Sequence, residues 1–190
     1  YYIRRFLQFW NTKLKELSVS EVTISKEVKI LFDEVFNLFE KNTAILKTGF
    51  SDDKRRYFAD ELGRPGEKYR ESIYTSGYTG ERKSLSVADF IKFTETALEY
   101  MDQSIHTNKR EDGLYHAYNL ISFSDSGVSI RYLYEMLEGQ VAVLSAGSLS
   151  TKEAANVLDA LKVSKLFRED QYSYILYPDR QLPLFSEKNN

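Results

Sequence analysis

The spacing of the apolar residues constrains the fold of this chain more than any other feature of the sequence. Over several long segments an apolar residue recurs at every third or fourth position. An α-helix turns once in about 3.6 residues, so this spacing places the apolar side chains on one face. The pattern predicts an all-α fold of antiparallel helical hairpins. The segments that carry it are residues 2–17, 28–39, 86–107, 132–146 and 154–161.

Residues 1–46 are expected to form the first helical hairpin. Its two amphipathic segments are joined by Ser18-Val19-Ser20, and so short a joint favours an antiparallel pair. The second segment carries an aromatic stripe that includes Phe32, Phe36 and Phe39. We interpret this stripe as core packing rather than as a cofactor site, because aromatic side chains dominate the energetics of ordinary cores.

Residues 47–84 are expected to be an irregular loop region, because glycine and proline recur there and interrupt any helical period. Within this region, Asp52–Leu62 is predicted to form a short charged helix that ends at Gly63. The part that follows is long for a connection inside a domain, and such loops are often functional or mobile. The alternative is that its charges are simply solvated.

Residues 85–190 are expected to form further helical hairpins. Ser150 and Glu153 have the spacing of a capping box, which marks the start of a helix, and Gly147 is expected to end the preceding one. The segment YSYILYP, residues 172–178, is predicted to be a short strand or an extended arm. Long loops are expected at one end of the helical array, and we place any binding site there.

Length and composition restrict the class of protein. The 190 residues suffice for one helical domain or a domain fragment, and a start at Tyr1 without methionine suggests an excerpt of a longer polypeptide. A net charge of −2, with basic residues spread along the chain, argues against nucleic-acid binding. No cysteine and only two histidines leave no convincing metal site, so no cofactor is expected. Apolar runs of about one helical turn predict no membrane span, and the compartment is left open.

One stretch between two helical segments has a different character. Asp112-Gly113 and Asp125-Ser126-Gly127 are turn signals, and the residues between them, LYHAYNLISF, favour β-structure. We therefore expect a small β-hairpin on one rim. A tyrosine ring can pack on a sugar and its hydroxyl can bond the sugar's rim, while Asn and His add directional hydrogen bonds. The alternative is that the tyrosines only cover helix ends. The residues concerned are Tyr115, His116, Tyr118 and Asn119.

Residues 112–167, DGLYHAYNLISFSDSGVSIRYLYEMLEGQVAVLSAGSLSTKEAANVLDALKVSKLF, resemble a known family. They are similar to the late part of the catalytic domain of the inverting cellobiose and chitobiose phosphorylases. There, an Asp-Gly-x-Tyr hairpin leads through a glycine turn to a helix with Glu-x-Gln. The phrases EDGLYHAYNLI and LEGQVAVLSAG also resemble large bacterial proteins loosely likened to these phosphorylases. The likeness covers roughly residues 86–185. Its matching positions are Asp112, Gly113, Tyr115, Tyr118, Gly127, Glu138, Gln140, Gly147 and 151–161.

The resemblance implies an (α/α)6 toroid, of which this chain would hold about half, with the site at the end that carries the long loops. It implies that Glu138 helps to hold an acceptor sugar and that Gln140 lies beside it. With Tyr118, His116 and Asn119 these two residues form the predicted substrate-binding site. This prediction requires Glu138 to lie close to Tyr118 rather than in bulk water.

Two departures from the family limit the expected activity. The arginine that precedes the hairpin's second tyrosine in the family is Ala117 here, and the Asp-Trp-Asn-Asp segment with the general acid is missing. The only tryptophan is Trp10, within a helical segment. An inverting phosphorylase needs a carboxylic acid to protonate the glycosidic oxygen, so no turnover is expected from these residues alone. Whether the parent protein is a phosphorylase or a hydrolase is left open.

The rival hypothesis is a non-catalytic helical interaction module. Half a toroid would leave inner helices uncovered, and that surface would be buried against the rest of a longer polypeptide or a second copy of the chain. The two hypotheses differ in the expected partner, which is a saccharide in the first and protein in the second. Glycan binding that depends on Glu138 and Tyr118 would favour the first.

Overall fold

The computed structural model describes residues 1–180 and 182–188. Within these residues the chain is mostly helical, as predicted, with three small two-stranded sheets, one of which is the β-hairpin that the prediction included. No helix in the described ranges is long and apolar enough to cross a membrane. The chain divides into two compact units, and each is described by itself. Unit 1 comprises Tyr1–Thr107 and Leu120–Arg131, and unit 2 comprises Asn108–Asn119 and Tyr132–Asn190.

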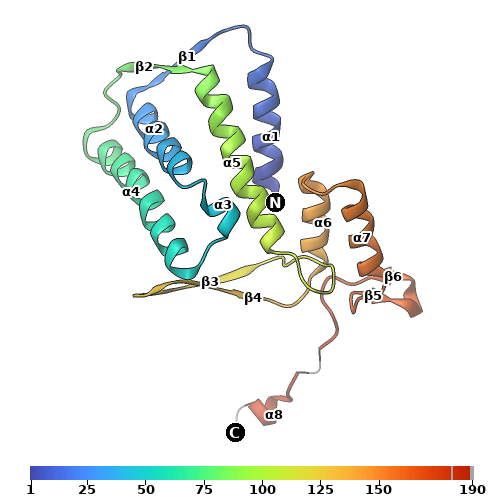
Figure 1. The fold of residues 1–190 in the computed structure, drawn as a ribbon. Helices are drawn as coiled ribbons and strands as arrows, with labels where there is room; N and C mark the ends of the chain where they lie inside the picture. Colours follow the sequence, from blue (N-terminus) through green and yellow to red (C-terminus); the bar gives the residue numbers. More distant parts are fainter. Residues whose placement is uncertain (181, 189–190) are drawn as a thin grey trace. The chain divides into compact units, whose positions relative to one another are not determined.

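Unit 1 is built on long helices. Figure 1 shows α5 lying between α1 and α2, with α4 beside α2. The buried Asn11 on α1 donates a hydrogen bond to Thr94 Oγ1 on α5 at 2.8 Å, and Arg4 pairs with Asp102 further along the same two helices. The elements are α1 (Tyr2–Lys15), β1 (Glu21–Ser25), α2 (Lys26–Lys41), α3 (Ile45–Thr48), α4 (Asp52–Ser76), β2 (Arg82–Ser86), α5 (Val87–Thr107) and all but one outer residue of each hairpin strand, β3 (Asn119–Ser124) and β4 (Gly127–Tyr132).

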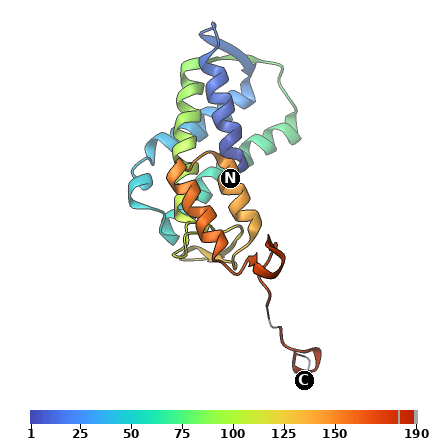
Figure 2. The ribbon, with the colours of Figure 1, turned by 90° about the vertical axis from the view of Figure 1, so that its right-hand side faces the viewer.

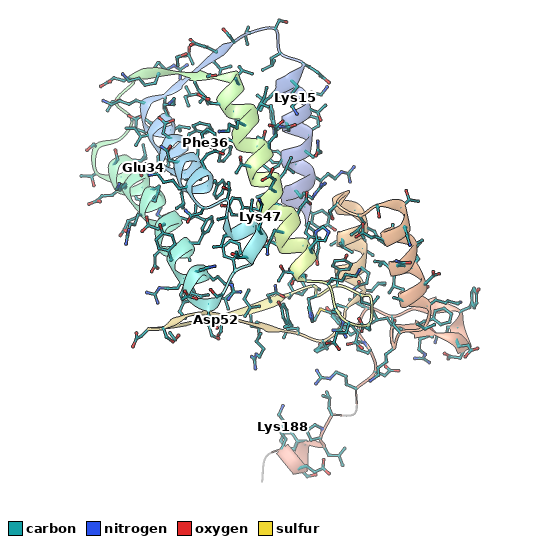
Figure 3. The ribbon with its side chains drawn as sticks, viewed as in Figure 1. Lys15, Glu34, Phe36, Lys47, Asp52 and Lys188 are labelled. Carbon is teal, nitrogen blue, oxygen red and sulfur yellow. The ribbon has the colours of Figure 1, made fainter. Side chains whose placement is uncertain are left out.

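The aromatic stripe of α2 lies in the core of unit 1. The ring of Phe39 stacks on Phe58 of α4 and on Phe93 of α5, with centroid distances of 5.9 and 5.8 Å. The ring of Phe36 also contacts Phe93, and Figure 3 shows it on the α5 side of α2. The buried Tyr100 donates its hydroxyl to the carbonyl oxygen of Phe39 at 3.0 Å. The interpretation of this stripe as core is confirmed.

Residues 1–46 do not form the predicted helical hairpin. A strand, β1, separates α1 from α2, and α1 packs on α5 instead. The strand exists because Val22 and Ile24 alternate with polar residues and pair with β2, where Leu85 opposite Val22 is buried. This partner strand is distant in sequence, so local periodicity could not reveal the pairing.

Residues 47–84 are mostly helical rather than irregular. Helix α4 continues past Gly63 and through Pro65 as far as Ser76, and ends at Gly77, whose φ of 68° suits glycine. Proline in a helix interior removes one backbone hydrogen bond, which is why the sequence predicts a break there. Packing against α2 overrides that local preference, since Phe58 and Pro65 are both buried.

Unit 2 contains a tight pair of helices, α6 (Leu137–Ala146) and α7 (Thr151–Lys162), which lie side by side in Figures 1 and 2. Gly147 ends α6 in the left-handed conformation, with a φ of 69°. The predicted capping box at the start of α7 is confirmed, because the Ser150 hydroxyl accepts from the Glu153 N–H and the Glu153 carboxylate accepts from the Ser150 N–H. The remaining elements are β5 (Phe167–Arg168), the 3₁₀ turn η1 (Glu169–Gln171), β6 (Ser173–Tyr174) and α8 (Phe185–Lys188).

The predicted hairpin after residue 111 forms, but later in the chain. Its strands are β3 and β4, and only the two residues Asp125 and Ser126 connect them. Because β4 extends to Tyr132, the next helix starts at Leu137 and not at the predicted position 132. Residues 172–178 contain a strand of two residues, β6, as one of the two alternatives predicted.

Gly127 fixes the hairpin to α4 within unit 1. A Cβ at this position would lie 2.8 Å from the backbone carbon of Asp52, so only glycine permits the approach. Figure 3 shows Asp52 at the end of α4 beside the hairpin. Arg55 reinforces the contact by donating to the carbonyl oxygen of Val128 at 2.5 Å.

Candidate functional site

Tyr118 and Glu138 lie next to each other in unit 2, as the sequence predicts. The Tyr118 hydroxyl donates to Glu138 Oε2 at 2.9 Å, and 55% of Tyr118 is exposed. Glu138 is in the first turn of α6, where the helix N-terminus favours a negative charge. We call this exposed aromatic ring and carboxylate the Tyr118–Glu138 pair.

Gly139 allows the two residues to meet. A Cβ at position 139 would lie 3.0 Å from the Cβ of Ala117 and 3.1 Å from its backbone nitrogen. The segment before β3 therefore packs directly against the first turn of α6. Tyr118, the residue after Ala117, lies next to Glu138 as a result. The sequence contained a signal for this contact, namely a glycine inside Glu-Gly-Gln, but the prediction did not use it.

Gln140 does not belong to the exposed site. Its side chain is fully buried, accepts from the N–H of Tyr115 at 2.8 Å, and donates to the carbonyl oxygens of Tyr115 at 2.8 Å and Met136 at 3.0 Å. Residues two apart on a helix point roughly 200° from each other, so Glu138 and Gln140 face opposite sides of α6. Gln140 is therefore a structural residue that fixes the backbone of Tyr115, contrary to its predicted contact with a ligand.

His116 packs within unit 2 rather than beside Tyr118. Its ring stacks on Tyr132 with centroids 4.0 Å apart and planes 9° apart. Burial lowers the pKa of His116, and the positive charge of Arg110 lowers it further, while a hydrogen bond with the backbone of Leu133 opposes both effects. These effects favour the neutral ring at neutral pH.

Asn119 is held by a second asparagine. Its Nδ2 donates to Asn108 Oδ1 at 2.8 Å, while its own Oδ1 is buried and has no hydrogen-bond partner among the described residues. No hydrogen bond within the described part of the chain joins Asn119 to Glu138. Of the five predicted site residues, the structure brings together Tyr118 and Glu138.

Arg110 was not predicted, yet it organises the residues around the site. Its guanidinium pairs with Asp112 at 2.8 Å and with Glu135 at 3.4 Å. The same pairing lowers the pKa of the Asp112 carboxyl and raises that of Arg110, chiefly through their hydrogen bonds. Asp112 also accepts from the N–H of Leu114 at 3.1 Å, which fixes the turn that leads into the site.

The Tyr118–Glu138 pair places an exposed tyrosine beside an exposed carboxylate. Glu138 has no other hydrogen bond among the described residues, so its second oxygen is open to an incoming hydroxyl group. Within residues 1–180 and 182–188, no group of three or more histidine or acidic side chains could hold a metal ion.

No model of a known protein family matches this chain, and no curated protein matches it either. The assignment of a function therefore depends on the geometry of the site.

Proposed function

We propose that this chain is part of a carbohydrate-active protein and that the Tyr118–Glu138 pair forms part of its sugar-binding site. The observation that supports this proposal is the 2.9 Å hydrogen bond between an exposed tyrosine and an exposed carboxylate. Tyr118 is 55% exposed, and the bond holds the carboxylate beside its hydroxyl. A pyranose presents the complementary groups, with an apolar C–H face next to its hydroxyl rim.

The proposal includes an (α/α)6 toroid of the phosphorylase or glycosidase type. Consecutive antiparallel helices such as α6 and α7 are the repeating pair of such a ring, and Glu138 lies in the first turn of α6. This stretch supplies binding rather than catalysis, because glycoside cleavage needs a protonated carboxylic acid and a second carboxylate or phosphate on the opposite face. Glu135, the nearest other carboxylate in sequence, is paired with Arg110.

The expected affinity is low. The pair is an exposed surface feature, so it removes little of a ligand from water and the cost of immobilising the sugar is only partly offset. A dissociation constant on the order of 1 mM corresponds to about −4 kcal/mol, which a single stacked ring and a few charge-assisted hydrogen bonds can provide.

The experiment is an NMR titration of the protein with glucose, N-acetylglucosamine, cellobiose and chitobiose. We expect shifts for Tyr118 and the first turn of α6 with at least one sugar, and loss of binding in Glu138→Ala and Tyr118→Ala. Tyr74→Ala is the matched control, since Tyr74 is 83% exposed on α4. Binding that survives both site variants, or no binding to any saccharide, would exclude this function.

A helical interaction module is the second candidate, and one observation favours it. Residues 2–10 of α1 expose a dense set of large apolar side chains, more than single scattered residues would explain. A second copy of the chain is the partner tested, by sedimentation velocity over a hundredfold range of concentration. Self-association that Phe6→Ser abolishes would support this candidate. The residues are Tyr2, Ile3, Phe6, Phe9 and Trp10, exposed by 43–66%.

A further inference from the structure

Three side chains at the end of α7 form a compact group in unit 2. Lys162 is the last residue of this helix, and Figure 1 shows the short strands β5 and β6 beyond the helix end. The Lys162 ammonium lies 3.7 Å from the ring centroid of Phe167 and 3.8 Å from that of Tyr172. Both distances are well inside the limit of about 6 Å for a cation–π contact. We call the two rings, Phe167 and Tyr172, the aromatic clamp.

The two rings of the aromatic clamp meet almost at a right angle. Their planes are 81° apart and their centroids are 5.7 Å apart. Each ring turns a face with negative π-electron density toward the ammonium, so the cation is bounded on two sides. Tyr172 is 79% exposed, and the clamp is therefore accessible from solvent.

The β5–β6 hairpin holds the clamp without help from Lys162. Phe167 pairs with Tyr174 across the hairpin, and their rings lie 5.3 Å apart. The N–H of Ile175 donates to the carbonyl oxygen of the fully buried Leu166 at 2.8 Å, which fixes the base of the hairpin. The rings are therefore expected to keep their positions when the lysine side chain moves away.

Tyr172 has a backbone conformation that tyrosine rarely adopts. Its φ of 48° and ψ of 44° lie in the left-handed region. In the described part of the chain it is the only residue other than glycine with a positive φ. Glycine would adopt this conformation more easily, because a bulky side chain is strained there. Strained residues of this kind cluster at sites that hold a ligand. The Tyr172 ring is thus held over the ammonium despite an unfavourable backbone.

Lysine is a poor match for the aromatic clamp. A primary ammonium is strongly hydrated and carries three N–H donors, and the ring faces give those donors no conventional acceptor. No ion pair holds Lys162 within residues 1–180 and 182–188. A quaternary ammonium has no N–H group that would lose an acceptor, so it leaves water more easily, and its methyl groups pack on aromatic rings.

We propose that the aromatic clamp binds a quaternary ammonium group and that Lys162 occupies the clamp until this ligand displaces it. Besides the two π faces, the C-terminal end of α7 favours a positive charge, because the helix dipole is negative there. Two sources share this chemistry, a free small molecule such as choline and a trimethylated lysine side chain. The clamp shares no residue with the Tyr118–Glu138 pair, so this proposal is independent of the sugar proposal.

The test is an NMR titration of the protein with choline at constant ionic strength. The control ligand is 3,3-dimethylbutan-1-ol, which has the shape of choline without its charge. We expect choline to bind about tenfold more tightly than the alcohol or better, and to shift the ring signals of Phe167 and Tyr172. Glu138→Ala should bind choline as the wild type does, which separates the clamp from the exposed carboxylate. Equal binding of choline and the alcohol would overturn the proposal.

Lys162→Ala removes the internal occupant, so the affinity for choline should rise about fivefold or more. Lys165→Ala is the matched control, because Lys165 is also exposed and its loss changes the net charge equally. Its affinity for choline should remain that of the wild type. If Lys162→Ala binds choline no better than Lys165→Ala, the lysine does not compete with the ligand and the proposal is wrong.

Tyr172→Gly removes one wall of the clamp and relieves the left-handed strain, so this variant should fold and lose choline binding about tenfold or more. Urea denaturation checks that its stability stays close to that of the wild type. Choline binding that persists in Tyr172→Gly contradicts the site. Titration with N-acetyl-trimethyllysine amide then assigns the source, and either result supports the clamp. Binding indicates a trimethylated lysine side chain, and binding of choline alone indicates a free small molecule.

Discussion

The side-chain amide of Gln140 bonds both backbone groups of Tyr115, accepting from its N–H and donating to its carbonyl oxygen, each at 2.8 Å. In a β-sheet, the backbone of a neighbouring strand makes hydrogen bonds of this kind with the N–H and carbonyl groups of a residue. Here the side chain of Gln140 on α6 makes both bonds. Because Tyr118 is three residues further on, this contact sets how the Tyr118 segment lies along α6. The position of the exposed pair thus depends on a buried side chain.

Gln140→Leu should lower the free energy of unfolding by about 2–4 kcal/mol, because it leaves the N–H and carbonyl of Tyr115 buried without partners. Urea denaturation measures the loss. Gln171→Leu is the control, since Gln171 is exposed in the short turn η1, and its effect should stay within about 0.5 kcal/mol. A loss below about 1 kcal/mol for Gln140→Leu would mean that Tyr115 is held by other contacts.

Gly139→Ala should destabilise the protein by about 1–3 kcal/mol, because the new methyl group would meet the backbone of Ala117 at 3.1 Å. It should also shift the NMR signals of Tyr118. Gly63→Ala in α4 is the matched control, because nothing lies within 4 Å of a Cβ there. Alanine is the better helix former, so this control should gain about 0.5–1 kcal/mol. The same sign for both substitutions would contradict the close approach of α6 and residue 117.

His116 should make stability depend on pH below about 7, with stability falling as the pH decreases. Its pKa in the folded protein is lowered by burial and by Arg110, so the unfolded chain binds the proton more readily. Stability is therefore full above the unfolded pKa of about 6.5 and falls as the pH decreases through the lower folded pKa. His116→Phe keeps a ring to stack on Tyr132 and should flatten this part of the curve. Urea denaturation at pH 7.0 and 5.5 measures the difference.

His106→Gln is the control for the loss of a histidine, because His106 lies on the exposed side of α5 in unit 1. If the pH dependence of stability persists in His116→Phe, another titratable group causes it. Carboxylates with lowered pKa values, such as Asp112, act in a separate window below about pH 4.5, since their unfolded forms take up protons there.

Local sequence signals were sufficient for some elements and not for others. The capping box at Ser150 and the aromatic core around Phe39 depend on residues within a few positions of one another, and both were predictable. The pairing of Val22 with Leu85 was not, because neither strand is stable without the other and their separation in sequence hides the match.

The candidate site shows the same division. The contact between Tyr118 and Glu138 was expected from a family resemblance, and the structure confirms their proximity. The side to which Gln140 points could have been derived from helical geometry, because alternate residues cannot share a helix face. Arg110 gave no such signal, since its partner Glu135 lies beyond the whole β3–β4 hairpin.

Pro65 allows a direct test of whether α4 is one helix or two. Inside a helix, proline is about 3 kcal/mol less favourable than alanine. Pro65→Ala removes roughly two buried methylene groups, worth about 0.8 kcal/mol each, from the contact with α2. The free energy gained by removing proline from the helix exceeds the free energy lost with the two methylene groups. The variant should therefore be more stable by about 1 kcal/mol, as measured by urea denaturation.

The opposite result would indicate that α4 is interrupted between Gly63 and Pro65. At the first position of a helix, proline costs nothing and its fixed φ is favourable. If one helix ended near Gly63 and a second began at Pro65, then Pro65→Ala would lose packing without gaining helix stability, and the protein would be destabilised by about 1–2 kcal/mol. The sign of a single free-energy change therefore decides between a continuous α4, as the structure has it, and a helix that ends near Gly63, as the sequence predicts.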